Sequence, residues 1–149
     1  MTDFTPFEDL LRGHAGLLED STHDRWLRAQ ALFEERAYRE AAALLTELLD
    51  ALSVDRADEG ADDGAKDGAE DGADGVRHEL TDVRLLLARS LFHSAQLDGT
   101  IRVATELLEH DPNEPYAHLL LGRAMQRQGR RSEAQPHLRL AELLGGYRS

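Results

Sequence analysis

The stretch that decides the fold reads LGRAMQRQGRRSEAQPHLRLA and covers residues 121–141. When this stretch is shifted along the sequence so that Gly122 aligns with Ala88, it superposes on LARSLFHSAQLDGTIRVATEL at residues 87–107. We refer to this step along the chain as the repeat offset. Apolar residues recur at three- and four-residue spacing in both stretches, which is the period of a helix buried on one side. The sequence therefore predicts a helical unit that is repeated at this offset.

An earlier copy of this unit lies upstream, and its distance along the sequence from the second copy is larger than the repeat offset. We call this distance the long offset. When Ala29 is placed on Ala88, Leu45 falls on Ala104. The long offset exceeds the repeat offset by the length of segment 53–77. We therefore expect three units, with residues 53–77 inserted between the first and the second.

Six helices are expected in these units, in pairs. Their predicted ranges are 22–35, 38–52, 80–94, 98–110, 114–128 and 132–144. Ser132 is predicted to cap the last helix together with Gln135, which would leave Pro136 in the first turn, where proline is tolerated. The Thr5-Pro6 start and apolar stripe of residues 1–21 predict one more, N-terminal helix.

The third unit resembles the tetratricopeptide repeat, a helix-turn-helix with a period of about 34 residues. The resemblance rests on Leu121-Gly122-x2-Met125, then Gly129, then Ala134-x3-Leu138. It implies an all-α fold of three such hairpins in a short right-handed solenoid, with an N-terminal helix and a disordered acidic insertion. The implied divisions are 1–21 for the N-terminal cap, 22–52, 78–112 and 113–149 for the three units, and 53–77 for the linker.

The segment 53–77 is expected to be an extended linker, because glycine recurs every fourth residue among acidic neighbours and alanines. A calcium site is the alternative, since aspartate-rich strings supply oxygen ligands. The EF-hand pattern also requires its acidic ligands, its glycine and its final glutamate in one fixed order, and this complete order does not occur between Asp62 and Gly72.

Composition excludes several functional classes. The formal charge is −12 without a lysine or arginine cluster, which disfavours nucleic acid and anionic membranes as partners. The chain has no cysteine, and the acidic N-terminus is unlike a signal peptide, so we expect a cytoplasmic protein. One lysine against sixteen arginines suggests a bacterial source.

No catalytic or cofactor motif is found in the sequence. The seven histidines show no metal-ligand spacing, and the glycine-rich stretch is acidic, which is the wrong charge for binding phosphate. We therefore expect no enzyme, no cofactor and no metal.

Proteins of the resembled family bind peptides in a concave groove lined by the first helix of each unit. The resemblance implies a scaffold or adaptor that binds protein or an acidic peptide here, with arginines binding its carboxylates. The implied groove residues are Trp26, Gln30, Phe33, Leu85, Arg89, Phe92, His93, Leu119, Arg123 and Arg127. In the alternative interpretation, the aromatic residues pack internally and the arginines pair with nearby glutamates.

The second functional hypothesis is a structural subunit that forms a homodimer or docks permanently through its terminal helix. His137, Leu140 and Leu144 form the expected self-association face, because an uncapped repeat exposes apolar surface. A small hydrolase or metal enzyme is the third and most distant hypothesis.

Overall fold

The computed structural model describes residues 22–59 and 70–147 and consists of α-helices, with no strand in those ranges. An all-α fold is thus confirmed. The six described helices are α2 (Thr22–Glu34), α3 (Tyr38–Glu59), α4 (Glu70–His93), α5 (Leu97–His110), α6 (Pro115–Arg127) and α7 (Arg131–Gly145). Each corresponds to one of the six predicted from the helical period. None of these helices is long and apolar enough to cross a membrane.

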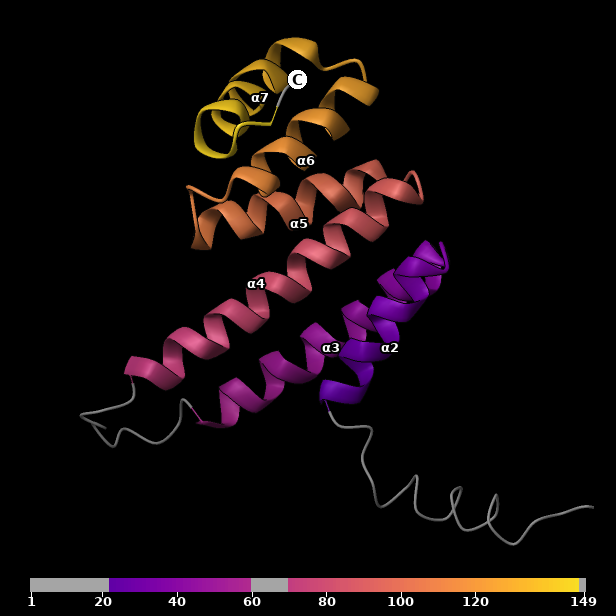
Figure 1. Cartoon of the computed structure of the whole chain (residues 1–149), viewed down its shortest axis with the longest axis vertical. Coiled ribbons are helices and arrows are strands. Elements are labelled where there is room, and N and C mark those ends of the chain that lie inside the picture. The colour runs from indigo at the N-terminus through magenta and orange to yellow at the C-terminus, as the bar shows by residue number, and fades with distance from the viewer. Residues whose placement is uncertain (1–21, 60–69, 148–149) are drawn as a thin grey trace, which may run out of the picture.

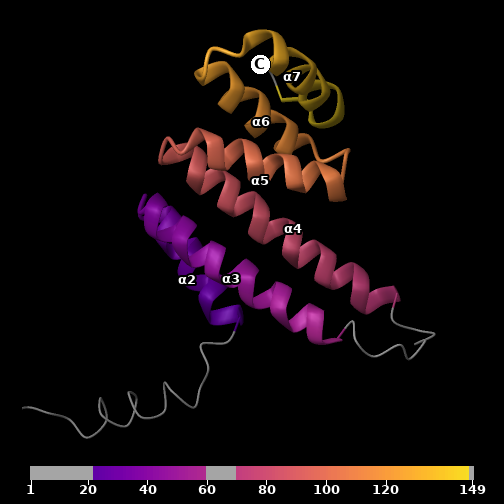
Figure 2. The same ribbon diagram turned by 180° about the vertical axis from the view of Figure 1, so that it is seen from behind.

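The helices succeed one another along the long axis of the molecule, and each packs against the next in sequence (Figure 1). Helices α2, α4 and α6 run in the same general direction. Neighbouring members of this set also touch, whereas α3, α5 and α7 make no contacts with each other over their described residues. The reverse view shows the same order (Figure 2). The first helices of the three pairs therefore form one side of the described fold.

The three pairs are closed by the same turn. Arg36, Ala95 and Gly129 each adopt a positive φ, of 65°, 61° and 82°. In each turn the following residue donates its backbone N–H to the carbonyl five residues back. These bonds join Ala37 to Leu32, Gln96 to Leu91 and Arg130 to Met125, all at 2.8 Å. This is the Schellman ending of a helix, in which a left-handed residue reverses the chain. The first two turns are separated by the long offset and the last two by the repeat offset.

Small residues occupy equivalent buried positions in the first helix of each pair. Ala29 and Ala88 are fully buried in the first core cluster. At the equivalent Gly122, an added Cβ would lie 2.7 Å from both Cγ and Cδ2 of Leu138. The second cluster contains Leu138, and both α5 and α6 contribute residues to each of the two clusters.

The structure differs from the predicted linker at both of its ends. Helix α3 continues to Glu59 and α4 begins at Glu70, so parts of segment 53–77 are helical. Residues 53–59 contain no glycine, which lets α3 extend beyond its apolar stripe. Residues 60–69, and the predicted N-terminal helix in residues 1–21, lie outside the described part of the chain.

The predicted start of α7 was wrong by one position. The helix begins at Arg131 after Arg130, and no side chain caps it, so Ser132 lies inside the helix. Pro136 is therefore in the second turn rather than the first. Proline there removes one backbone hydrogen bond, because the carbonyl of Ser132 loses its usual donor.

Two histidines join α6 to α7. The rings of His118 and His137 stack at 5.4 Å, and their Nδ1 atoms are 3.2 Å apart. His118 Nε2 lies 2.8 Å from the carbonyl oxygen of Pro112, which can only accept, so Nε2 carries a proton. In this tautomer, Nδ1 of His118 accepts a hydrogen bond from the Nδ1–H of His137. Burial, and then the neighbouring His118, lower the pKa of His137.

Gly129→Ala should lower the free energy of unfolding by about 1 kcal/mol, because the left-handed conformation disfavours a Cβ. No atom lies within 4 Å of the added methyl, so the loss would come from the backbone alone. Urea unfolding measures this loss in the free energy of unfolding. The matched control is Ala95→Gly in the equivalent turn, which should be neutral or slightly stabilising. Equal stability of Gly129→Ala and wild type would contradict the assigned turn.

Stability should fall as the pH drops below about 6.5, the ordinary pKa of histidine. A histidine with a lowered pKa in the fold takes up its proton more readily when unfolded, so acid favours unfolding until the folded pKa is also passed. Val103 stands at the position equivalent to His137 in the preceding unit. His137→Val should therefore reduce the slope of stability against pH. Urea midpoints between pH 5 and 8 give the measurement, with exposed His110→Gln as control. An unchanged slope in His137→Val would refute the role of the pair.

Candidate functional site

A groove of about 600 Å³ lies on the side formed by α2, α4 and α6, and we refer to it as the central groove. Its lining residues are Trp26, Gln30, Asp82, Leu85, Leu86, Arg89, Glu114, Tyr116 and Tyr147. Four of the ten residues predicted for a groove are among them: Trp26, Gln30, Leu85 and Arg89. The groove thus combines aromatic and aliphatic surface with charges of both signs.

Arg89 is held between rings from two other helices. Its guanidinium carbon lies 4.6 Å from the centre of the Phe33 ring in α2 and 5.5 Å from that of Tyr116 in α6. At these distances the ring faces attract the cation. The Nε atom is buried and has no hydrogen-bond partner in the described structure. Arg89 is therefore a fixed positive charge with an unused donor.

Beside Arg89, a cluster of rings connects the first two helical pairs. Phe33, Tyr38 and His93 lie with ring centres 4.8 to 5.7 Å apart, and His93 stacks on Tyr38. Burial lowers the pKa of His93, and the positive charges of Arg89 and Arg127 lower it further. His93 is therefore neutral at pH 7, which leaves the arginines as the positive charges of this region.

Arg127 lies over a different ring from Arg89. Its guanidinium carbon is 5.2 Å from the centre of the Phe92 ring, and its Nη1 donates to the Phe92 carbonyl at 3.5 Å. Phe92 packs against the first core cluster. Phe33 and Phe92 thus pack internally, as the alternative interpretation of the sequence expected. Over the described residues, neither Arg89 nor Arg127 forms the expected ion pair with a glutamate, unlike Arg130, which pairs with Glu133.

Six of the ten predicted groove residues do not line the central groove, and Leu119 and Arg123 are two of them. Leu119 is 6% exposed and belongs to the second core cluster, although Trp26 and Leu85 at equivalent positions line the groove. Arg123 is exposed on α6 and is not among the residues that line the central groove.

Sequence reasoning missed the acidic and tyrosine residues of the groove. Glu114 precedes α6, and its carboxylate accepts from the backbone N–H of Tyr116 at 3.3 Å. Tyr147 follows α7 and stacks edge-on against Tyr116 at 5.7 Å. Only Asp82 had a sequence signal, because it stands seven residues before Arg89 and so shares its helix face.

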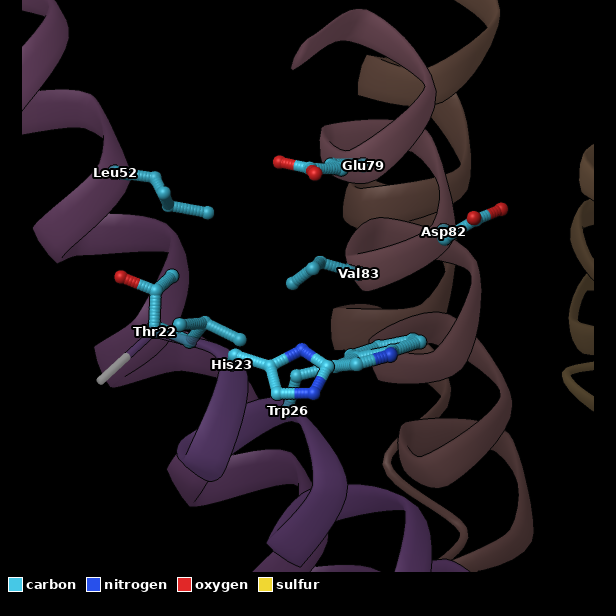
Figure 3. Close-up of a pocket in the computed structure, with 8 residues that line it drawn as sticks. Thr22, His23, Trp26, Leu52, Glu79, Asp82 and Val83 are labelled. Carbon is cyan, nitrogen blue, oxygen red and sulfur yellow. The ribbon is translucent and has the colours of Figure 1, made fainter. Parts of the chain in front are cut away.

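A second cavity, of about 320 Å³, lies between α2, α3 and α4. In Figure 3, Leu52 and Val83 point into this cavity from opposite helices, and the indole of Trp26 lies below them. Asp82 points away from the cavity, whereas Glu79 points toward it. Trp26 and Asp82 line both hollows, so the two residues separate the second cavity from the central groove.

The predicted self-association face is only partly on the surface. His137 is half-buried, and its ring stacks on that of His118. Leu140 and Leu144 are 39% and 44% exposed, and Leu143, which the prediction omitted, is 75% exposed. An apolar face on α7 is therefore present with different members.

No group of three potential metal ligands occurs among the described residues. The chain matches no model of a known protein family, and no curated protein sequence matches it either.

Proposed function

We propose that this protein is a non-catalytic adaptor of the tetratricopeptide-repeat type, which binds a peptide segment of a partner protein in the central groove. Three features support the repeat assignment: the pairing of helices, the contacts among α2, α4 and α6, and the recurrence of one turn at the long offset and the repeat offset. The small residues Ala29, Ala88 and Gly122 recur at the same offsets.

Arg89 is the observation that carries the binding proposal. Its Nε is desolvated and unpartnered, and the ring faces of Phe33 and Tyr116 hold the guanidinium in place. An unsatisfied buried donor costs free energy that a ligand acceptor would recover. A carboxylate is the matching acceptor, because its charge and its two oxygens suit a guanidinium. An acidic side chain or the C-terminus of a peptide therefore fits this site.

Arg89→Met should weaken binding of an acidic peptide by roughly tenfold, because charged hydrogen bonds contribute about 1.5 to 3 kcal/mol. The probe is acetylated and amidated Ala-Leu-Ala-Glu. Trp26 is the only tryptophan of the chain and lines the groove, so its fluorescence reports occupancy. The matched control is Arg102→Met on the exposed surface of α5. Equal affinity for wild type and Arg89→Met would end the carboxylate assignment.

Self-association through α7 is the second candidate, favoured by a comparison inside the chain. Leu140 and Leu143 correspond to Glu106 and Glu109 in α5, and to Glu47 and Asp50 in α3. All six side chains are exposed, so the same outward positions are acidic in two helices and leucine in the third. A second copy of the chain packing on this face would remove the leucines from water.

Leu143→Glu should convert a dimer to a monomer without loss of helicity, because the side chain is 75% exposed in the single chain. The charge would have to be buried in the dimer interface, which is strongly unfavourable. Light scattering coupled to size exclusion gives the mass, with Leu27→Glu on α2 as a control for an exposed leucine elsewhere. A wild-type chain that stays monomeric at high concentration would exclude this candidate.

A further inference from the structure

We infer that the central groove selects a peptide carrying both charges, with an acidic group at Arg89 and a basic group about three residues away at Asp82. This inference rests on the proposed function and names the ligand class of the same groove. It replaces the expectation of a purely acidic ligand, because the groove that contains Arg89 also contains two carboxylates.

The opposite charges lie on one stripe of α4. Asp82, Leu85 and Arg89 are spaced by three and four residues, so they share a helix face. The helix between Asp82 and Arg89 separates the acidic from the basic end by about 10 Å. A peptide in the polyproline II conformation rises about 3.1 Å per residue with three residues per turn. Side chains three positions apart then share one face and lie about 9 Å apart, which matches that separation. Leu85 lies between the charges and offers an apolar contact to the residues in between.

The groove has further groups suited to these charges. Trp26 lines the groove one helical turn before Gln30, and an indole face attracts cations. In the repeat register, Trp26 corresponds to Leu85 and Gln30 to Arg89. All four of these residues line the central groove. Asp82 points away from the second cavity in Figure 3 and is among the residues that line the central groove.

The charges of the groove do not neutralise one another. Within the described residues, neither Asp82 nor Glu114 forms an ion pair with Arg89, although all three line the same hollow. Glu114 already accepts a hydrogen bond from the backbone N–H of Tyr116 at the start of α6. Asp82 is therefore the groove carboxylate that has no such hydrogen bond in the described structure. A ligand with two opposite charges would satisfy both ends at once.

The test compares blocked tetrapeptides by the fluorescence of Trp26. Lys-Leu-Ala-Glu and its reverse, Glu-Ala-Leu-Lys, carry the two charges three positions apart. Leu-Lys-Glu-Ala has the same composition with adjacent charges, and Ala-Leu-Ala-Glu lacks the lysine. One of the first two should bind roughly three- to fivefold tighter than the last two, which is the size of an exposed ion pair.

Asp82→Asn should remove this advantage and leave the affinity for Ala-Leu-Ala-Glu no weaker. Glu106→Gln, an exposed carboxylate of α5, is the matched control and should change nothing. If all peptides containing glutamate bind equally, or if the advantage survives Asp82→Asn, the two-charge inference is wrong while the peptide groove stands. If no peptide binds, the proposed function fails together with it.

Discussion

The close approach of the two helices within each pair is the constraint on which the rest of this structure depends. Gly122 has no room for a Cβ beside Leu138, and the equivalent Ala29 and Ala88 have no exposed surface. Helices packed this closely need small residues at the contact, since protein interiors are filled almost to crystal density. The Schellman turns at Arg36, Ala95 and Gly129 then bring the second helix back at the same geometry each time.

The position of the central groove follows from this packing. Because α2, α4 and α6 contact each other while α3, α5 and α7 do not over their described residues, the first helices share one surface. Arg89 is central to that surface, since rings from α2 and α6 both contact its guanidinium. A charge positioned by three helices loses little freedom when a ligand binds, which lowers the cost of recognition.

Much of the fold could be predicted from the sequence, because helical period and repeat offset are local signals. The six helices appear where apolar residues recur, and the turn residues appear at the two offsets. The ends of helices were harder to predict. Ser132 has the chemistry of a cap, yet α7 begins before it, and α3 continues past its apolar stripe through residues 53–59. At the start of α7, residues 131–133 are exposed, so the sequence carries little signal for that end.

By itself, the sequence determined that this chain forms paired helices of one repeated design, because burial of an apolar stripe at the helical period depends on local order alone. The tertiary structure decided which of the residues at equivalent repeat positions line the groove. Trp26, Leu85 and Leu119 share a register position, but only Leu119 is enclosed by the second core cluster. His137 turns inward because His118 on the neighbouring helix offers its ring an acceptor. Such outcomes depend on contacts between distant segments, and a register position cannot specify what lies opposite it.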